Sequence, residues 1–321
     1  MFKKEINKTD ILIIGNGEIG NRHFKIIKEH NKYLNIKKVS SRFFNSNSKK
    51  FTLDKEFKPK IIVLANPASL HLKNLKNLSH LDSYYFIEKP LTDKIFKQDL
   101  KYINKIININ KIYVGYNLRF LNSLIKLKKL LTQKIIGDVR IIKINVGYYL
   151  PKWRKKIKYI NSVTAQKKLS GGLLFELSHE FDYLLWLFGN IEKFKSIKDK
   201  ISDLKIDIED SHFIIGKINK NILFSINFDL LNHAKTRTCE IIGTKNTLIW
   251  NGNENSIKIY NKKNDRFTKI FTSKQNVSHT YVKQWIYFYN KYLKNDIFEN
   301  SFNSSVKIVR MINLIYGAKN E

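Results

Sequence analysis

The sequence predicts an α/β protein built from two domains. The first, residues 1–118, is expected to be a Rossmann domain with a doubly wound parallel sheet. The second, residues 119–321, is expected to be an α/β domain with an open, mostly antiparallel sheet. Three observations carry this prediction: a glycine-rich turn after the first apolar strand, alternating strands and helices up to residue 116, and a later run of strands without intervening helices. The length of 321 residues also exceeds that of one ordinary domain.

In the first part, apolar stretches alternate with amphipathic ones, which is typical of a parallel sheet covered on both faces. The expected strands are Asp10 to Ile14, Ile36 to Ser41, Lys60 to Ala65, Tyr84 to Ile87 and Lys111 to Gly115. The expected helices are Ile19 to Glu29, Leu70 to Leu78 and Asp93 to Ile107.

The second part opens with helices and an extended segment and continues as a strand series. We expect helices at Leu121 to Leu131, Leu173 to Phe188, Thr280 to Leu293 and Ser304 to Tyr316, with an extended segment at Val139 to Leu150. The expected strands are Phe213 to Ile218, Ile222 to Phe228, Thr236 to Ile242, Thr247 to Trp250, Ile257 to Tyr260 and Phe267 to Phe271. An open sheet leaves one face uncovered, so a homo-oligomer formed through this sheet is expected.

Composition excludes several classes of protein. The net charge of +32 would suit a nucleic-acid partner, but only eight of the 59 basic residues are Arg, and the lysines are scattered among Asn, Ile, Phe and Tyr. A base-biased genome explains this composition, so no specific nucleic-acid partner is expected. The single Cys239 and the dispersed histidines indicate neither a disulfide framework nor a metal site. With no signal peptide and no long apolar run, a cytoplasmic protein without a membrane partner is expected.

The motif from Gly15 to Gly20 indicates a dinucleotide site. Gly15 permits a tight strand-to-helix turn, Gly17 lets the backbone approach a pyrophosphate, and Gly20 lets the next helix pack closely on the strand. An ordinary strand-to-helix turn is the alternative. The cofactor-binding residues expected from this turn are Gly15, Asn16, Gly17, Glu18, Ile19 and Gly20.

The end of the second strand favours NADP over NAD. A NAD site usually places Asp or Glu there to bind the ribose 2′-hydroxyl, whereas this segment reads Val39-Ser40-Ser41-Arg42. Ser41 can donate a hydrogen bond to a 2′-phosphate, and Arg42 can pair with it bidentately. In the alternative, Arg42 is a solvated loop charge and both cofactors are used.

Three motifs in order resemble those of the Gfo/Idh/MocA oxidoreductases. They are the glycine turn, Glu88-Lys89-Pro90 after a predicted strand, and the segment from Ser170 to Asp182 that contains Ser178-His179-Glu180. The resemblance covers nearly the whole chain and includes Asn66-Pro67 with His71, Gly115 to Phe120, and Arg237 through Gly243-Thr244. The stretch Tyr149 to Arg154 looks most like members found in bacterial surface-glycan synthesis, which is a looser match.

The resemblance implies a catalytic role for three residues. Lys89 would lie beside the nicotinamide and the substrate hydroxyl, and His179 would exchange the proton of that hydroxyl. Glu176 replaces the family's usual Asp and precedes His179 by three residues instead of four, although His179 and Asp182 keep the H-x-x-D spacing. Positions three apart still share one helical face, so Glu176 can orient the imidazole.

The remaining site residues also follow from the resemblance. Asn66, Pro67, His71 and Glu88 join the cofactor-binding set, although histidines such as His23, His71 and His212 are structural by default. The expected substrate-binding residues are Tyr116, Asn117, Arg119, Tyr149, Trp153, Arg154 and Arg237. For the last four and Arg119, core packing is an equally good interpretation.

The function implied is an oxidoreductase that transfers a hydride between a nicotinamide cofactor and a hydroxyl or keto carbon of a sugar or nucleotide-sugar. A cofactor-retaining epimerase, lyase or hydrolase of the same family is one alternative. A non-catalytic dinucleotide-binding regulator is another, and the altered spacing of Glu176 and His179 keeps it open.

Overall fold

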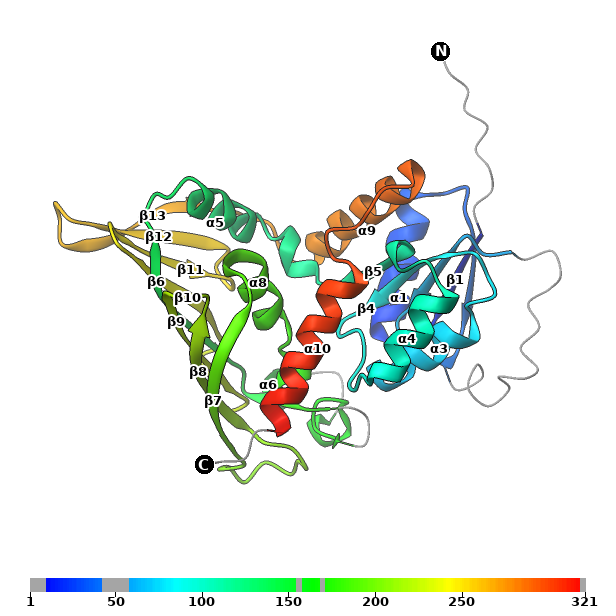
Figure 1. Cartoon of the computed structure of the whole chain (residues 1–321), viewed down its shortest axis with the longest axis horizontal. Coiled ribbons are helices and arrows are strands. Elements are labelled where there is room, and N and C mark those ends of the chain that lie inside the picture. Colours follow the sequence, from blue (N-terminus) through cyan, green and yellow to red (C-terminus); the bar gives the residue numbers. More distant parts are fainter. Residues whose placement is uncertain (1–9, 42–57, 154–157, 168–170, 318–321) are drawn as a thin grey trace, which may run out of the picture. The chain divides into compact units, whose positions relative to one another are not determined.

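The computed structural model describes residues 10–41, 58–153, 158–167 and 171–317 (Figure 1). The chain divides by its contacts into two compact units. Unit 1 comprises residues 1–116 and 281–310, and unit 2 comprises residues 117–280 and 311–321.

Unit 1 contains a parallel sheet of five strands. They are β1 (Asp10–Ile14), β2 (Asn35–Val39), β3 (Ile61–Leu64), β4 (Tyr84–Glu88) and β5 (Ile112–Gly115), in the order β2-β1-β3-β4-β5. All pairs are parallel, and residues 11–14 of β1 and the whole of β3, β4 and β5 are buried. This is the Rossmann-type sheet that the sequence predicts.

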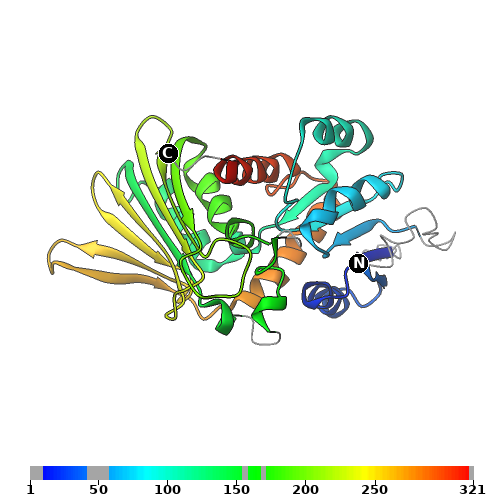
Figure 2. The same ribbon diagram turned by 90° about the horizontal axis from the view of Figure 1, so that it is seen from below.

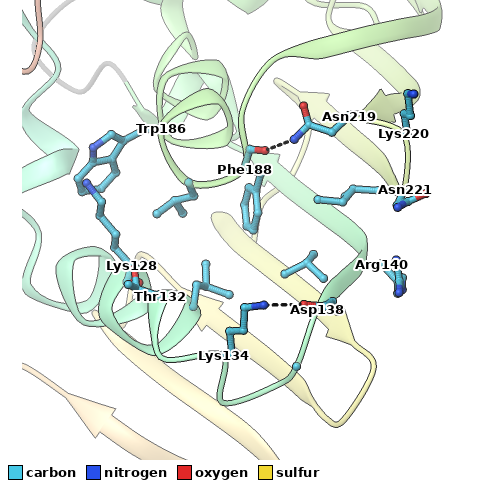
Figure 3. Close-up of a pocket in the computed structure, with 15 residues that line it drawn as sticks. Lys128, Thr132, Lys134, Asp138, Arg140, Trp186, Phe188, Asn219, Lys220 and Asn221 are labelled. Atoms are coloured by element: carbon cyan, nitrogen blue, oxygen red, sulfur yellow. Dashed lines mark hydrogen bonds and ion pairs between the residues drawn. The ribbon is translucent and has the colours of Figure 1, made fainter.

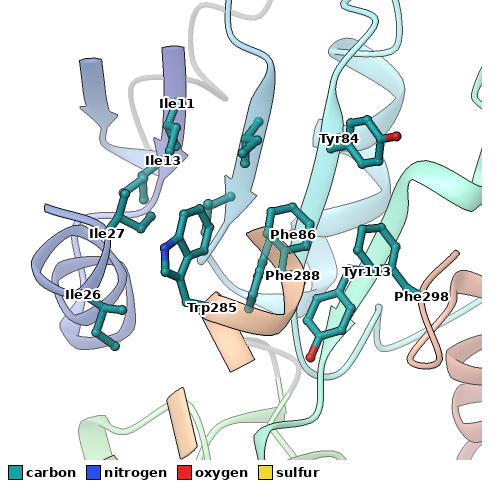
Figure 4. Close-up of a cluster of buried hydrophobic side chains, with 12 residues drawn as sticks. Ile11, Ile13, Ile26, Ile27, Tyr84, Phe86, Tyr113, Trp285, Phe288 and Phe298 are labelled. Carbon is teal, nitrogen blue, oxygen red and sulfur yellow. The ribbon is translucent and has the colours of Figure 1, made fainter. Parts of the chain in front are cut away.

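Helices cover both faces of this sheet. In the described part of unit 1, the helices that precede β5 are α1 (Glu18–His30), α3 (His71–Asn77) and α4 (Lys97–Ile106), with short 3-10 turns η1 (Ala68–Leu70) and η2 (Ile109–Lys111). Ile26 and Ile27 of α1 pack on the face formed by Ile11, Ile13 and Phe86 (Figure 4). On the other face, the Tyr85 hydroxyl donates to the Leu78 carbonyl that ends α3, at 2.8 Å. Because consecutive side chains of a strand point to opposite faces, Phe86 packs toward α1 and Tyr85 toward α3.

A helix far along the chain completes this core. Trp285 and Phe288 of α9 (Val277–Lys294) pack against Phe86 and Tyr113, with Phe288 and Phe298 stacked at 5.3 Å between ring centroids (Figure 4). The Trp285 indole N–H donates to the Asn31 side chain at 2.9 Å. Unit 1 is thus discontinuous, whereas the domains expected from the sequence divide linearly at residue 118. The final helix, α10 (Phe302–Gly317), contributes to both units.

Unit 2 contains a mixed sheet of eight strands, seen as one layer in Figure 2. They are β6 (Val139–Gly147), β7 (Ile191–Asp199), β8 (Ser211–Ile218), β9 (Ile222–Asp229), β10 (Thr236–Gly243), β11 (Thr247–Asn251), β12 (Ser256–Asn261) and β13 (Arg266–Thr272). The order is β13-β12-β11-β10-β6-β9-β8-β7, and only the β6–β9 pair is parallel. The mostly antiparallel sheet and the predicted fold class are confirmed.

Helices of unit 2 cover one face of this sheet. They are α5 (Asn122–Thr132), α6 (Leu150–Trp153), α7 (Leu173–Glu176) and α8 (His179–Phe188), with 3-10 turns η3 (Asn117–Phe120) and η4 (Tyr159–Asn161). Phe181 of α8 stacks on Phe228 of β9, and the Trp250 indole of β11 donates to Ser123 of α5 at 2.8 Å. The opposite face exposes Phe213, Ile215 and Leu223.

Two sequence-based expectations were wrong. The helix expected at Leu173 to Phe188 is two helices, because Leu177 and Ser178 form a turn between α7 and α8. Strand β7 was not expected at all. Its apolar residues Ile191, Phe194 and Ile197 recur every third position among lysines, so the two-residue period of a half-buried strand is absent.

Candidate active site

The glycine turn follows β1, the strand at which the chain connections of the unit 1 sheet change from one side of the sheet to the other. Strand β1 is flanked by β2 on one side and β3 on the other, so the loops after β1 and β3 run to opposite sides of a crevice. The Gly15 N–H donates to Val39 of β2, and the Ala65 N–H donates to Ile14 of β1, both at 2.9 Å. The turn is therefore at the position where open parallel sheets bind ligands.

Each glycine of the motif has a different steric role. Gly15 has φ +131°, and a Cβ there would lie 2.4 Å from the Ala65 oxygen. A Cβ on Gly20 would lie 2.0 Å from the Gly15 oxygen, which explains the close approach of α1 to the turn. Around Gly17 no atom of the described chain lies within 4 Å of a Cβ position. Gly17 precedes α1, so the free space faces helix N-terminal N–H groups that can bind a phosphate.

The other residues expected in this turn line it on the solvent side. Asn16 is exposed, and its carbonyl accepts from the Asn21 side chain at 3.2 Å. The Glu18 carboxylate pairs with Arg22 at 3.3 Å and so points away from the start of α1, where a phosphate would bind. Ile19 is half-buried.

Asn66, next to Pro67, supplies an independent sign of a ligand. Both polar atoms of its side chain are buried, and neither has a hydrogen-bond partner in the described part of the chain. Because leaving buried amide atoms unpaired is costly, a bound polar group would satisfy them. With the open space at Gly17, this residue set fits a dinucleotide.

The E-K-P motif follows β4, the strand next to β3. Lys89 is half-buried, and the Lys89-Pro90 peptide bond is cis. Glu88, expected to contact the cofactor, has its Oε1 2.6 Å from Nε2 of His23 on α1. Its other oxygen, Oε2, accepts from the Lys89 N–H at 3.3 Å.

His71 is buried beneath the same edge of the sheet. Its Nε2 lies 2.8 Å from the main-chain carbonyl oxygen of Asn66, and its Nδ1 lies 3.1 Å from that of Pro90. Burial lowers the pKa of this imidazole, while the carbonyl contacts act in the opposite direction. His71 therefore links the loops after β3 and β4.

The segment expected to select the cofactor is only partly described. Residues 35–41 contain no carboxylate, and Ser41 is half-buried just after β2. Arg42 lies outside the described residues, as does Arg154.

In unit 2, His179 is the first residue of α8 and is buried, whereas Glu176 ends α7 and is half-buried. The turn between the two helices means that the pair does not share one continuous helical face. The adjacent Ser178 hydroxyl is buried and has no hydrogen-bond partner among the residues described.

Two arginines expected to bind substrate form buried ion pairs with α8. Arg119 makes a bidentate contact with Asp182, with Nε to Oδ2 at 2.9 Å and Nη2 to Oδ1 at 2.7 Å. Arg237 Nε lies 2.9 Å from Glu180 Oε1. These contacts hold the helix that begins with His179 in place. Both arginines therefore have a structural role in addition to the substrate contacts expected of them.

The aromatic residues gather where β6 ends. Tyr148 stacks on Trp153 at 4.7 Å, and Arg237 lies over the Tyr148 ring at 5.7 Å. Tyr149 stacks on His233 at 3.9 Å. His233 was missed by sequence reasoning because it lies in the loop before β10, far along the chain. Through Glu180 and Arg237, this cluster adjoins the start of α8.

The two remaining expected residues are interior. Tyr116 is fully buried, and the Asn117 side chain donates to Thr280 Oγ1 at 2.6 Å. In the described ranges no group of three or more His, Cys, Asp or Glu residues could hold a metal ion. No helix in these ranges is long and apolar enough to cross a bilayer.

A pocket of about 490 Å³ in unit 2 contains none of the expected site residues (Figure 3). It is lined by ends of α5, α8, β6 and β9, and its walls include Trp186, Phe188 and Arg140. Lys134 pairs with Asp138 at 3.1 Å, and Asn219 donates to the Phe188 carbonyl at 3.1 Å. Cations near helix C-termini stabilise the helix dipole, so the basic lining needs no ligand.

Comparison with known proteins supports the family resemblance in unit 2. Residues 124–249 match the family model of the GFO/IDH/MocA C-terminal domain. An uncharacterized oxidoreductase of Synechocystis sp. is 25% identical over an alignment of 202 residues, which covers 59% of this chain and 53% of that protein. The match thus spans about half the length of this relative. The family resemblance is thus supported over residues 124–249.

Solved structures extend the likeness to the whole fold. Levoglucosan dehydrogenase in complex with NADH and levoglucosan aligns with a TM-score of 0.79 at 15% identity, covering 96% of both chains. The WlbA dehydrogenase from Bordetella pertussis, in complex with NADH and UDP-GlcNAcA, aligns with a TM-score of 0.72 at 18% identity, covering 97% of this chain and 95% of that one. At these identities the likeness establishes the fold.

Proposed function

We propose that the chain is a nicotinamide-dependent oxidoreductase that acts on a hydroxyl-bearing carbon of a sugar or nucleotide-sugar. One observation carries the proposal: the loops after β1, β3 and β4 bring three features to the same edge of one sheet. These are the glycine cradle, Lys89, and the Asn66 side-chain amide, which has no hydrogen-bond partner among the described residues. The family match in unit 2 and the 25% identity to an oxidoreductase support it.

The cradle would hold the pyrophosphate on the N–H groups at the start of α1. A bound nicotinamide would supply the hydride acceptor or donor. Lys89 would donate a hydrogen bond from its ammonium to the reacting oxygen, and His179 would take up or return the hydroxyl proton. Glu176 would stabilise the imidazolium form of His179 through its charge.

We propose NADP as the preferred cofactor, since the described end of β2 offers no carboxylate for a ribose 2′-hydroxyl. The solved relatives named above carry NADH, which makes NAD the alternative. Fluorescence titration of wild type and Arg42→Ala with NADPH and NADH tests this preference. A loss of roughly 10- to 150-fold for NADPH alone supports it, and equal losses for both cofactors contradict it.

The aromatic cluster of Tyr148, Tyr149, Trp153 and His233 is the proposed sugar-binding surface, because flat rings stack on sugar faces. The likeness to WlbA, which was solved with UDP-GlcNAcA, supports a nucleotide-sugar substrate. We propose a role in surface-polysaccharide synthesis from the sequence stretch Tyr149 to Arg154, which resembles members of that kind. We further propose that the chain is cytoplasmic and forms a homo-oligomer through the exposed apolar face of the unit 2 sheet.

Lys89→Met tests the proposed function. The near-isosteric apolar side chain removes the donor, so turnover should fall about 100- to 10,000-fold while NADH binding remains. Lys94→Met, which changes an exposed lysine five residues further on, is the matched control and should keep full turnover. Unchanged turnover in Lys89→Met would remove Lys89 from the mechanism.

A further inference from the structure

The side chain of Tyr316, near the end of α10, contacts the start of α7 within unit 2. Its hydroxyl donates to Oε1 of Glu209 at 2.6 Å, and the same hydroxyl oxygen accepts from the Leu174 N–H at 3.2 Å. These two partners lie 107 and 142 positions away in the chain. The segment that leads to His179 is therefore held by residues that are distant in the sequence.

The chemistry of this contact assigns the direction of each hydrogen bond. Burial and the neighbouring Glu209 raise the pKa of Tyr316 well above its usual value, so the hydroxyl keeps its proton. An ionised carboxylate only accepts, so the hydroxyl donates to Glu209 and uses its oxygen to accept from Leu174. Burial raises the pKa of Glu209, while hydrogen bonds from Tyr316 and from the Leu173 main chain act in the opposite direction. One hydroxyl and one carboxylate thus bind consecutive N–H groups at the start of α7, and each bond polarises the next.

The Tyr316 ring is itself fixed by three other side chains of unit 2. Lys198 of β7 donates to the Tyr316 carbonyl at 2.8 Å, and its Nζ lies 5.0 Å from the ring centroid. The rings of His212 on β8 and Phe175 on α7 lie at 6.0 and 5.6 Å between centroids. The hydroxyl is therefore presented to α7 from a defined position on the sheet.

Helix α7 is a single turn and depends on contacts of this kind. A turn of four residues is not stable by itself, because helix nucleation is unfavourable. Gly172, which precedes the turn, has φ +144°, and a Cβ there would lie 2.9 Å from the Tyr316 hydroxyl oxygen. The Glu176 N–H donates to the Gly172 carbonyl at 3.1 Å. The glycine thus allows Tyr316 to approach the turn, and the position of that turn sets the backbone of Glu176.

We propose that Tyr316 and Glu209 are positioning residues for α7: they hold the start of this helix and so fix the backbone of Glu176 and the turn that leads to His179. This inference rests on the proposed function, in which Glu176 and His179 handle the proton of the substrate hydroxyl. Reacting groups must be held close to the productive geometry, and the residues packed behind them provide that precision.

Hydrogen exchange of the cofactor-free full chain, read at single residues by mass spectrometry, tests this contact without a substrate. Tyr316→Phe removes only the hydroxyl, so the Leu174 amide should exchange about 3- to 10-fold faster. Glu209→Leu should accelerate exchange at both Leu173 and Leu174. Glu209→Gln, whose amide oxygen can still accept from the hydroxyl, should keep Leu174 within about threefold of wild type.

Two controls separate positioning from a general loss of stability. Tyr260→Phe is the matched variant, because Tyr260 donates to the Asp265 carboxylate in the hairpin between β12 and β13, and it should leave the Leu174 amide unchanged. The amides of β11 are the internal reference for unit 2. Unchanged exchange at Leu174 in Tyr316→Phe would overturn the inference, and so would an acceleration at β11 equal to that at Leu174.

Turnover is then measured with NAD⁺ or NADP⁺ and the sugar or nucleotide-sugar that the wild type oxidises fastest. Tyr316→Phe should lower kcat about 3- to 10-fold and leave KM within about twofold. In a Glu176→Gln background the same substitution should cost less, because one of the side chains that α7 positions is already changed. A normal kcat in Tyr316→Phe, or two losses that simply multiply, would reduce Tyr316 to a structural residue and contradict the inference. If the wild type oxidises no sugar or nucleotide-sugar, the proposed function fails, but the exchange data still decide whether Tyr316 and Glu209 hold α7.

Discussion

Alanine substitutions at Gly17 and Gly20 should separate cofactor binding from folding. At Gly20, a Cβ would lie 2.0 Å from the Gly15 oxygen and 2.8 Å from its carbonyl carbon, so either the turn or α1 must move. Overpacking of this kind costs roughly 1–3 kcal/mol. For a unit of this size, each kcal/mol lowers the melting temperature by about 2–4 °C, so Gly20→Ala should melt about 2–12 °C lower.

At Gly17 the expectation is reversed. No atom lies within 4 Å of the new Cβ, and φ is −73°, which any residue adopts. Stability should therefore change by less than about 1 kcal/mol, since the entropy gain of replacing Gly is of that order. The methyl group would instead occupy the space in which a pyrophosphate approaches the backbone. NADH binding should weaken about 10- to 100-fold, or about 1.4–2.7 kcal/mol.

The assay pairs thermal melts of the cofactor-free variants with NADH fluorescence titrations. Normal NADH binding by Gly17→Ala would refute the cradle as the pyrophosphate site. A normal melting temperature for Gly20→Ala would refute the close packing of α1 on the turn.

Three further predictions address unit 2. Arg119→Ala removes the bidentate guanidinium contact of the buried Asp182 carboxylate, so denaturant unfolding should show a loss of about 3–5 kcal/mol, and a shift in substrate KM without this loss would contradict the structural role. Burial, with a smaller effect of Lys198, lowers the pKa of His212 to about 4, below the value of about 6.5 for a free imidazole. As the pH falls below about 6.5, the unfolded chain therefore binds a proton that the folded chain does not. Up to about 3 kcal/mol of stability should be lost by about pH 4, and an equally steep loss in His212→Leu would exclude this cause. Ile215→Glu places a charge on the exposed apolar face of the sheet and should shift the mass measured by light scattering toward the monomer, whereas an unchanged mass would move the proposed oligomer interface elsewhere.

Features set by neighbouring residues were predictable from the sequence. The Gly15 turn and its flanking elements follow from local backbone requirements, and the strands from β8 to β13 follow from short β-rich runs between turns. The ends of these strands agree with the structure to within about two residues, as expected for pattern-based assignments.

Features set by distant contacts were not predictable. The amphipathic pattern of α9 indicates a buried face but not that Trp285 packs in the core of unit 1. Likewise, nothing near Arg119 or Glu88 in the sequence reveals the partners Asp182 and His23, which lie 63 and 65 positions away. Pairing of this kind depends on which elements the fold brings together.

Hydride transfer from substrate carbon to nicotinamide is the central claim, and isotope labelling tests it most directly. A panel of sugars and nucleotide-sugars, each deuterated at a hydroxyl-bearing carbon, would be incubated with the protein and either NAD⁺ or NADP⁺. Mass spectrometry would then locate the deuterium. The account predicts deuterium in the released reduced nicotinamide for one class of substrate, and loss of this transfer in Lys89→Met and His179→Asn. Deuterium retained in the sugar product or released to water, or tight cofactor binding with no transfer from any substrate, would contradict it.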